Sequence, residues 1–455
     1  MTIISASQAK NSGSYPPGPK GHFLLGSLFE YNSDSLNFLS KCAQEYGDVV
    51  FCKGSLFSFY LLNHPDYIQE VLGTKSNQFG KSPRWEWTRR LLGNGILTSE
   101  GEFWQRQRRL IQPAFQRERI FAYGQVMVDY TQQLLNSWED GETRDVYADM
   151  LALTLEIIAK SLFQVDEKEA VEVIGKALKN SIEYFEAPSN NLLLFLLPDW
   201  FPTSKNLNYL KAVRSLDNVI YTTLNQRRAS GQDKGDLLSM LLQIQDEDGT
   251  KMSDKQIRDE MIGMLIGGRE STALVLCWTW YLLSQHPEVE SKLLEELQTI
   301  LGGQAPTIAD LPQLRYTEKV VMEVMRLYPP VATVGRTALQ NCEVAGYPVH
   351  AGDTIMMSQW VMHHDPRYFN NPEAFNPDRW EADLIKRLPA FAYFPFSGGP
   401  MICIGKSFAM MELVLLLATI AQQFRLKLVP DQKVTLCNPF LVRPKNRIKM
   451  LLNKR

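Results

Sequence analysis

Apolar residues recur at helical spacing along much of the chain. This spacing predicts long helices over residues 36–46, 102–115, 148–183 and 253–285, and a further helix that begins at Pro287. Residues 48–53 and 57–62 instead alternate and favour β-branched or aromatic side chains, with Gly54 between them, which predicts a β-hairpin. The pattern indicates a mainly α protein with a small β-sheet region.

Composition places the chain among ordinary globular proteins. It has 455 residues, of which 45% are hydrophobic and 22% are charged, and a formal net charge of −2. This length could hold about three domains. The motifs described below are spread through the chain, however, so we expect one domain over residues 16–455 after a flexible tail over residues 1–15. A charge so close to neutral argues against a nucleic-acid-binding protein.

The cysteines and the apolar runs bear on the cellular compartment. None of the six cysteines stands in a Cys-x-x-Cys pair or at zinc-ligand spacing, so reduced thiols are the simplest interpretation. Residues 1–15 lack the apolar core of a signal peptide. No run reaches the roughly 18 apolar residues of a membrane span, and Glu412 interrupts the run over residues 408–424. We expect a soluble, cytoplasmic monomer without a transmembrane anchor.

The glycine-rich stretch over residues 396–405 carries the strongest chemical signal. Cys403 stands just before an apolar run over residues 408–424 that predicts a buried helix. Free backbone N–H groups and the helix dipole favour a thiolate at such a position. Two glycines before Cys403 allow a turn, and Gly405 leaves room for a group lying against the backbone. This favours a single axial thiolate ligand to a large, flat metal cofactor over a buried cysteine that only packs.

This stretch resembles the haem-binding loop of the cytochrome P-450 superfamily, the haem-thiolate monooxygenases. Phe396, Gly399, Cys403 and Gly405 match the family pattern Phe-x-x-Gly-x-Arg/His-x-Cys-x-Gly. The resemblance implies haem b (iron protoporphyrin IX) with Cys403 as the iron ligand, and the cytochrome P-450 fold, a large helical region with a small β-sheet region around the buried haem. Met401 departs from the pattern, because the family usually has a base there that pairs with a haem propionate.

The middle of the predicted helix over residues 253–285 interrupts its apolar pattern. Two glycines, Arg269, a carboxylate and two hydroxyls follow one another there, although a glycine costs about 1 kcal/mol in a helix interior. Close helix packing at the glycines, with the carboxylate solvated, would explain this locally. By resemblance, Gly267 borders the haem where the helix opens, and an acid–alcohol group delivers protons to bound oxygen: Glu270, Ser271 and, in a supporting place, Thr272.

A basic stretch around Trp104 and Arg108 carries another match. The two residues are four apart and share one face of a predicted helix, as an ordinary surface pair also would. In the family, Trp-x-x-x-Arg binds haem propionates, and by resemblance Arg336 is a further propionate partner. Four more arginines make the stretch basic, which fits either a solvated face or a docking patch for an acidic electron donor: Arg106, Arg109, Arg117 and Arg119.

Three charged residues match a structural motif of the family. Glu323 and Arg326 lie on an apolar predicted helix, and Arg379 follows in a later Phe-x-Pro-x-Arg-like segment. On its own, a glutamate three residues before an arginine is weak evidence. By resemblance, the three residues form a buried triad that locks the scaffold of the haem loop. Such a network must be fully paired, because an unpaired buried charge is very costly.

Three smaller features complete the sequence-based interpretation. The adjacent pair His363 and His364 has the wrong spacing for a metal site on a helix, so we interpret it as part of a loop. Thr307 and Asp310 resemble a helix-starting capping box. Residues 191–202 are apolar and bounded by prolines, as a core segment would be, and by resemblance they fall where the family has a mobile lid over the substrate channel.

By resemblance, the chain is a monooxygenase that inserts one oxygen atom from O2 into a small hydrophobic substrate. The candidate pocket residues are apolar, which favours a fatty acid or a terpenoid: Leu97, Gly267, Val331, Phe440 and Leu441. The chain has no flavin or iron–sulfur signature, so electrons are expected from a separate ferredoxin and its reductase. Two alternatives stay open, namely a peroxide-using peroxygenase or isomerase, and a non-catalytic haem or ligand-binding protein.

Overall fold

The computed structural model describes residues 15–21, 26–54, 58–82, 84–190, 203–245, 249–381, 383–437 and 441–455. The chain divides into two compact units, each assembled from segments that are distant in the sequence. The sheet unit comprises Met1–Pro83, Ala332–Pro372 and Ile385–Ile402, and the helical unit comprises Arg84–Val331, Glu373–Leu384 and Cys403–Arg455. One boundary therefore falls inside the predicted haem-binding loop, directly before Cys403.

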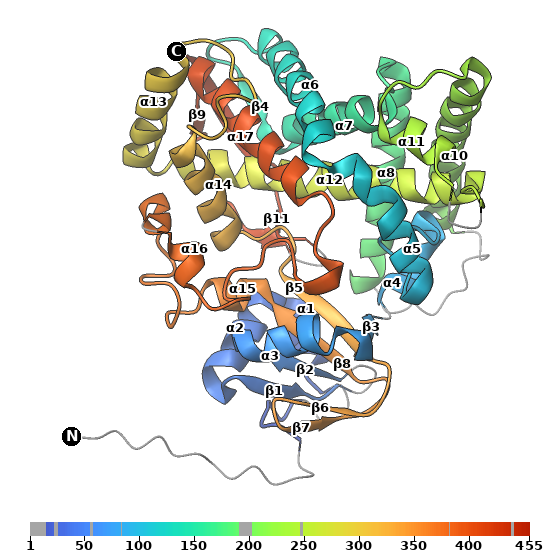
Figure 1. Cartoon of the computed structure of the whole chain (residues 1–455). Coiled ribbons are helices and arrows are strands. Elements are labelled where there is room, and N and C mark those ends of the chain that lie inside the picture. Colours follow the sequence, from blue (N-terminus) through green and yellow to red (C-terminus); the bar gives the residue numbers. More distant parts are fainter. Residues whose placement is uncertain are drawn as a thin grey trace. The chain divides into compact units, whose positions relative to one another are not determined.

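One five-stranded sheet organises the sheet unit, with the strand order β1-β2-β8-β5-β3 (Figure 1). Its strands are β1 (Val49–Cys52), β2 (Phe59–Leu62), β3 (Phe79–Lys81), β5 (Thr333–Ala338) and β8 (Thr354–Ser358). β1 and β2 form the predicted antiparallel hairpin, whereas β2 and β8 run parallel. All residues of β2 and β8 are buried, so β2 is apolar on both faces rather than alternating as predicted.

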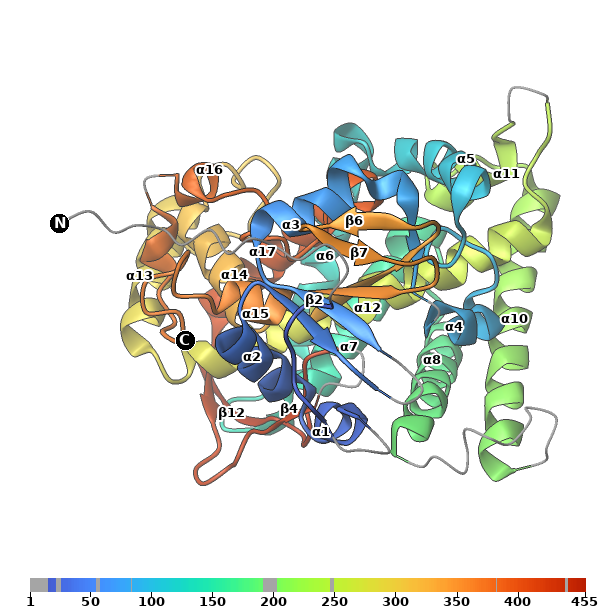
Figure 2. The same ribbon diagram turned by 90° about the horizontal axis from the view of Figure 1, so that it is seen from below.

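Apolar clusters cover both faces of this sheet. Tyr60 and Leu62 of β2 belong to one cluster, and Phe59 and Leu61 to the other, because successive strand residues point to opposite faces. α2 (Ser35–Tyr46) packs on the second cluster, beside the strands in Figure 2. The unit's other elements are α1 (Leu28–Ser33), α3 (Pro65–Gln69), η1 (Glu70–Thr74), η2 (Ser76–Gln78), α15 (Gln359–His363), η5 (Gly399–Met401) and the hairpin of β6 (Cys342–Val344) and β7 (Tyr347–Val349).

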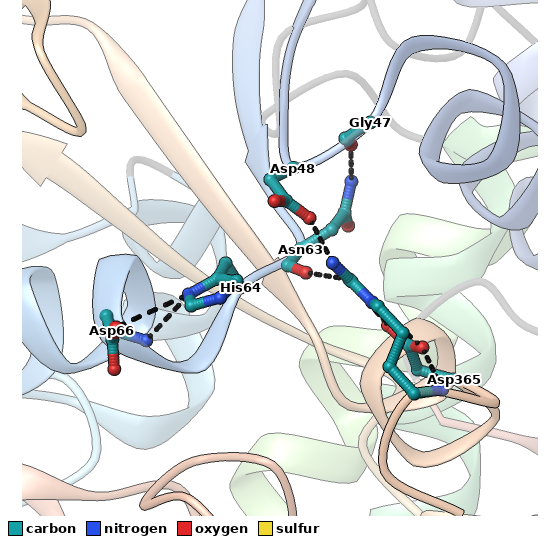
Figure 3. Close-up of polar contacts among 7 residues, drawn as sticks. Gly47, Asp48, Asn63, His64, Asp66 and Asp365 are labelled. Atoms are coloured by element: carbon teal, nitrogen blue, oxygen red, sulfur yellow. Dashed lines mark hydrogen bonds and ion pairs between the residues drawn. The ribbon is translucent and has the colours of Figure 1, made fainter. Parts of the chain in front are cut away.

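A polar network ties the residues after α15 to the first hairpin (Figure 3). Arg367 donates to the Asp48 carboxylate at 2.7 Å and to the backbone oxygen of Asn63 at 2.8 Å. It also bonds to Asp365 Oδ2 through Nε at 2.9 Å and Nη2 at 2.6 Å. A guanidinium that binds a carboxylate through two bonds fixes direction as well as position. The network therefore holds the end of α15 against the β1–β2 hairpin.

α12 (Asp254–Leu283) is the longest helix described and contacts several others of the helical unit (Figure 1). It begins with a capping box, in which Ser253 and Gln256 each accept a backbone N–H of the other. α7 (Val146–Phe163) and α17 (Lys406–Gln423) both pack against it.

The remaining helices of this unit surround these three or lie on their flanks. They are α4 (Arg84–Leu92), α5 (Gly101–Ile111), η3 (Gln112–Phe115), α6 (Arg117–Asn136), α8 (Lys168–Asn190), α10 (Ser204–Ser230), α11 (Leu237–Gln243), α13 (Pro287–Leu301), α14 (Arg315–Leu327) and η4 (Pro377–Trp380). α16 (Leu384–Arg387) lies at a boundary between the units. Two small sheets complete the unit: β4 (Thr143–Asp145), β12 (Lys449–Lys454) and β9 (Phe424–Leu428), and β10 (Leu436–Cys437) with β11 (Arg443–Pro444).

The mainly α architecture with small sheets is confirmed, and three details differ from the prediction. The helix expected over residues 148–183 is two helices, because Gln164 takes a left-handed conformation with φ of 51°. The backbone N–H of Thr307 donates to Asp310 Oδ2 at 2.8 Å, as in a capping box, but a run of turns follows, and α14 begins only at Arg315. The third difference is β12, a strand near the end of the chain that the sequence patterns above did not predict.

Some predictions concern residues that the structure does not describe. The expected lid over residues 191–202 and the pocket residue Phe440 lie outside the described residues, as does the expected tail except for Tyr15. Within the described ranges, no helix combines the length and the apolar character that crossing a membrane requires.

Candidate active site

The middle of α12 presents an accessible face on an otherwise buried helix. Gly267 is exposed and Ser271 is half-buried, whereas most positions on either side of them are buried. The two residues share one face, because residues four apart lie one turn apart. A Cβ atom placed on Gly267 would meet no atom of the described residues within 4 Å. Ser271 Oγ donates to the Gly267 carbonyl at 2.6 Å, a type of bond that often bends helices.

The second glycine of the pair has a different role. A Cβ atom on Gly268 would lie 2.0 Å from Ile158 Cδ1 of α7, so this glycine allows the two helices to approach closely. At the same crossing, Thr154 Oγ1 of α7 donates to the backbone oxygen of Arg269 at 2.9 Å. Helix packing, the local explanation of both glycines, therefore accounts for Gly268 but not for Gly267.

Glu270 is buried, with 6% of its surface exposed, so the alternative of a solvated carboxylate is wrong. Tyr147 Oη of α7 donates to Glu270 Oε1 at 3.1 Å, and Arg443 Nη1 of β11 lies 3.8 Å from the same oxygen. Burial, followed by the charge of Glu270, raises the pKa of Tyr147, so the phenol stays protonated and can donate. Groups from α7 and β11 thus hold this carboxylate, and sequence analysis named neither of them.

Thr272 lies beside a residue that sequence analysis mentioned only as an interruption of an apolar run. Glu412 of α17 is 1% exposed, and within the described ranges neither of its oxygens has a well-formed hydrogen bond. Burial raises the pKa of the Glu412 carboxyl well above its usual range, and the nearby Thr272 hydroxyl opposes this shift only in part. A charged residue in the middle of an apolar helix was the signal that could have revealed this buried acid.

Cys403 stands at the start of α17, whose N-cap is Gly405. The side chain is accessible, but surrounding protein atoms limit its hydration, and this raises the pKa of the thiol. The Gly405 backbone N–H and the Arg108 guanidinium act in the opposite direction and lower the same pKa. Two groups that favour a thiolate, the Gly405 N–H and the Arg108 guanidinium, are therefore present. Their combined effect on the pKa of Cys403 is smaller than that of the lost hydration.

Both residues of the expected propionate-binding pair, Trp104 and Arg108, lie on α5 of the helical unit. Trp104 is buried and Arg108 is half-buried. Burial lowers the pKa of Arg108, and the nearby Cys403 raises it in part. Arg108 and Cys403 are therefore neighbours, as the resemblance implies. Arg106 is half-buried and Arg109 is exposed on the same helix.

The rest of the predicted haem loop belongs to the sheet unit. Gly399 has a φ of 66°, and a Cβ atom there would lie 1.7 Å from the backbone oxygen of Leu72. Glycine is therefore required on both counts. Phe396 and Met401 are half-buried. Arg336 of β5 has 9% of its surface exposed, and its Nη1 donates to the backbone oxygen of the preceding glycine at 2.9 Å.

The predicted pocket residues of the helical unit lie in two places. Leu97 is half-buried, and a Cβ atom on Gly263 of α12 would lie 3.6 Å from its Cδ1. Val331 is exposed and Leu441 is half-buried. The segments that carry these two residues meet, because the residue after Leu441 donates its N–H to the backbone oxygen of Pro330 at 2.9 Å.

Glu323, Arg326 and Arg379 come together as the resemblance implies. Glu323 Oε1 accepts from Arg326 Nη2 at 2.8 Å and from Arg379 Nε at 2.8 Å. Its Oε2 accepts from Arg326 Nε at 2.9 Å and from the Trp380 indole at 3.0 Å. The backbone N–H of Asn376 adds a bond of 3.1 Å to Oε1. This fully buried carboxylate is therefore completely paired, and it joins α14 to η4.

The position of the first of the two adjacent histidines differs from the prediction of a loop. His363 is the last residue of α15 rather than part of a loop. It is buried, and its Nε2 accepts the Phe394 backbone N–H at 3.0 Å. Across the part of the chain that the structure describes, no group of His, Cys, Asp or Glu residues is placed to hold a metal ion. The role of His363 is to accept a backbone hydrogen bond.

Together, the helical fold, the single loop cysteine beside Arg108 and the accessible glycine of α12 define a haem-thiolate protein. The chain belongs to the cytochrome P-450 family, whose model matches residues 16–452.

The comparisons with individual proteins agree with this assignment. The chain is 36% identical to cyclooctat-9-en-7-ol 5-monooxygenase of Streptomyces melanosporofaciens, over 90% of this chain and 88% of that protein. It is 31% identical to pentalenene oxygenase of Streptomyces avermitilis, over 90% and 91%. Among solved structures, retinoic acid-bound cyanobacterial CYP120A1 superposes with a TM-score of 0.87 at 25% identity, covering 98% of this chain and all of that one.

The family assignment establishes the cofactor and the class of reaction. The family binds haem b through a cysteine thiolate. The donors present here fit that group, since a cysteine and an arginine are neighbours and no described residue fills the space where a side chain of Gly267 would be. The protein is an oxidoreductase of the monooxygenase type.

Proposed function

We propose that this protein oxygenates apolar, terpenoid-type substrates, with Cys403 as the iron ligand of its haem b. The observation that carries the proposal is the accessible face of α12. Gly263, Gly267 and Ser271 follow one another at four-residue spacing on that face, and Leu97 packs beside Gly263. The face therefore combines an apolar wall with one hydroxyl.

The relatives favour a terpenoid over a fatty acid. The names of two of them specify cyclooctat-9-en-7-ol and pentalenene, and a structural neighbour binds retinoic acid. Each of these names denotes a mainly hydrocarbon compound, which suits the apolar side chains expected around the substrate: Leu97, Val331, Phe440 and Leu441. A buried apolar site binds such a compound mainly by removing apolar surface from water.

The proposed haem contacts are the residues that match the family's haem-binding motifs. When bound, the haem supplies the reductive activation of O2 and the transfer of one oxygen atom. Cys403 holds the iron, and Trp104, Arg108 and Arg336 hold the propionates. The remaining contacts are with backbone and apolar groups: Gly267, Phe396, Gly399 and Gly405. The Arg108 charge lowers the pKa of the Cys403 thiol, which favours the thiolate.

The three proposed proton-handling residues have unequal positions. Ser271 Oγ lies on the accessible face, so we assign it the last proton transfer toward the substrate side. Its bond to the Gly267 carbonyl must break for Oγ to turn, because one hydroxyl has a single proton. Glu270, held by Tyr147, is the proposed relay: its carboxylate would take up a proton from solvent and pass it on to restore the proton of Ser271. Thr272 is buried beside Glu412 and supports the helix rather than the transfer itself.

The proposed electron source is a separate ferredoxin with its reductase. Arg109 on α5 and Arg119 on α6 are exposed and belong to the basic stretch next to Arg108. An acidic donor would be attracted there, and the attraction should weaken with salt. Arg109→Glu should lower the rate with limiting ferredoxin about tenfold at low salt, whereas the same charge reversal at exposed Lys179 of α8 should not.

The substrate proposal is tested by spectral titration and by turnover. Purified protein is titrated with a panel of cyclic terpenes and, separately, with saturated fatty acids, while the haem absorption is followed for the loss of iron-bound water. Tight binding and NADPH-dependent hydroxylation of a terpene through ferredoxin and reductase support the proposal. Turnover with peroxide but with no reductase system would support a peroxygenase instead, and binding of fatty acids alone would overturn the terpenoid assignment.

Cys403→Ala tests the ligand assignment directly. The reduced, carbon monoxide-bound protein should show the red-shifted band of a thiolate-ligated haem, and the variant should lose it. A band that is unchanged in the variant would show that another residue holds the iron.

A further inference from the structure

Two adjacent carboxylates of α12 hold the segment that leads to Leu97. Asp259 Oδ2 accepts the backbone N–H of Asn94 at 2.9 Å, and Glu260 Oε2 accepts the backbone N–H of Ile96 at 2.9 Å. Both carboxylates are buried, with 2% and 1% of their surfaces exposed. Backbone N–H groups that bind charged acceptors form strong hydrogen bonds. The segment is therefore fixed to α12 at two points directly before Leu97.

Two glycines allow this segment to lie against the helix. Gly93 has a φ of 60°, and a Cβ atom on it would lie 2.0 Å from Asp259 Cγ. A Cβ atom on Gly95 would lie 2.9 Å from the backbone oxygen of Asp259. Thr98 Oγ1 then closes the turn by donating to the Gly93 carbonyl at 2.8 Å. The sequence of the segment thus matches the shape of the helix surface on which it lies.

Arg258 compensates the buried negative charge and extends the attachment. Its Nη1 donates to Asp259 Oδ1 at 2.8 Å and to the backbone oxygen of Leu91, the penultimate residue of α4, at 2.8 Å. Its Nε donates to Asp217 of α10 at 2.7 Å. α4 and α10 both contact α12 (Figure 1). A buried carboxylate is tolerated only when it is paired in this way, so three consecutive residues of α12 organise the surrounding segments.

The hydrogen bonds of Asp259 and Glu260 to the loop backbone determine the position of Leu97. Leu97 follows Ile96 directly, and its Cδ1 lies 3.6 Å from the position of a Cβ on Gly263. Gly263 shares its helix face with Gly267 and Ser271, the residues proposed to border the reaction site. A displacement of the Ile96 backbone would therefore move Leu97 relative to that face.

We propose that Asp259 and Glu260 are positioning residues that determine substrate orientation by fixing Leu97 beside the accessible face of α12. The inference rests on the proposed function, in which Leu97 borders the substrate. It adds that two buried carboxylates, which themselves face away from the substrate toward the loop backbone, set the specificity of the site.

The test uses two ligands that bind haem iron through a ring nitrogen, namely imidazole and 4-phenylimidazole. Both shift the haem absorption band, so dissociation constants can be measured without knowing the native substrate. Imidazole reports on the iron, and the phenyl group of the second ligand reports on the walls of the site. The ratio of the two constants is measured for the wild type, Leu97→Ala, Glu260→Ala, Glu260→Gln and Gly95→Ala. Gly95→Ala displaces the loop and leaves both carboxylates intact.

The matched control is Glu296→Ala. Glu296 of α13 also accepts backbone N–H groups from another element, at Tyr316 and Thr317, with bonds of 2.6 and 2.8 Å. This variant should lower the unfolding midpoint without changing the ratio. A purely structural role of Glu260 would give the same result.

We expect Glu260→Ala and Gly95→Ala to change the ratio about tenfold, in the direction of Leu97→Ala, since small changes in an apolar wall alter discrimination by that order. Glu260→Gln should retain most of the wild-type ratio, because its amide oxygen still accepts. If Leu97→Ala changes the ratio but Gly95→Ala and Glu260→Ala do not, the inference is overturned. If the wild type shows no band shift with imidazole, the haem assignment is wrong. If Leu97→Ala does not change the ratio, both the proposed pocket and this inference are wrong.

Discussion

Two buried glutamates of the helical unit show how differently the same side chain can be accommodated. Glu323 on α14 is fully buried and Glu412 on α17 is 1% exposed. Glu323 accepts bonds from two guanidiniums, one indole and one backbone N–H. Glu412 has a threonine hydroxyl as its neighbour, and burial raises its pKa well above the usual range. One glutamate is a paired charge, and the other is a neutral acid in an apolar environment.

The difference lies in what each location has to do. Glu323 joins α14 to η4, and a charge pairs in fixed directions, so the network specifies one arrangement of two elements. Glu412 lies beside Thr272, one residue from the serine of the accessible face. A neutral acid at that place adds no field to the proposed proton route, whereas an ionised one would. The comparison leads to three predictions, in order of decreasing effect.

Breaking the Glu323 network should have the largest effect. Arg379→Ala leaves a buried carboxylate short of one of its charged partners, which should lower the free energy of unfolding by about 3–5 kcal/mol. Denaturant unfolding of the haem-bound protein, followed by the haem band and by circular dichroism, measures the loss. Arg379→Lys should recover only part of it, because lysine lacks the planar fork.

An exposed ion pair provides the control for this first variant. Arg425 Nε lies 3.0 Å from Glu290, and the Arg425 side chain is 40% exposed. Arg425→Ala should therefore lower the free energy of unfolding by less than about 1 kcal/mol. Equal losses in Arg379→Ala and Arg425→Ala would mean that burial of the Glu323 network contributes nothing.

Glu412→Gln should change how stability depends on pH. Because the pKa of Glu412 is raised in the folded protein, the native state keeps a proton that the unfolded chain releases above a pH of about 4.5. The wild type should therefore lose stability as the pH rises above that value and toward the folded pKa, by about 1.4 kcal/mol per pH unit. Glutamine does not titrate, so the variant lacks this loss and becomes relatively more stable as the pH rises.

Unfolding free energies at pH 5 and pH 8 measure this second prediction. The difference between the wild type and Glu412→Gln should move in favour of the variant by about 1 kcal/mol or more. Parallel profiles would show that Glu412 is ionised in the native protein, which would remove the contrast with Glu323.

The contrast also shows which parts of this site can be predicted from sequence. Glu323 and its arginines could be predicted because they belong to a family pattern, and the helices could be predicted because their apolar spacing is regular. The partners of Glu270 and Thr272 could not. Tyr147 lies 123 residues from Glu270 in the sequence, and hydrophobic periodicity contains no information on contacts between distant helices. Even a local motif can be misleading, because the capping-box-like pair Thr307 and Asp310 precedes a run of turns rather than a helix.

The pair of α12 glycines illustrates the same limit. Sequence patterns show two adjacent glycines, but only the packing distinguishes them: Gly268 lies against Ile158, whereas Gly267 faces no atom of the part of the chain that the structure describes. The surroundings of Cys403 were also only partly predictable from sequence. A helix N-terminus could be expected to favour the thiolate, whereas the extent to which neighbouring atoms exclude water depends on the folded structure.

Thr272→Val should have the smallest effect and tests whether the Glu412 environment depends on the hydroxyl. Valine has nearly the same shape, so the core stays filled. Neither Glu412 oxygen has a well-formed hydrogen bond within the described ranges, so the change in unfolding free energy at pH 5 should stay below about 1 kcal/mol, the net value of one well-formed hydrogen bond. The hydroxyl lowers the pKa of Glu412, so its removal should raise that pKa further and extend the pH range over which stability falls. A double-mutant cycle with Glu412→Gln separates this coupling from packing. Strictly additive effects would show that the two side chains do not interact, and the neutral acid would then be maintained by burial alone.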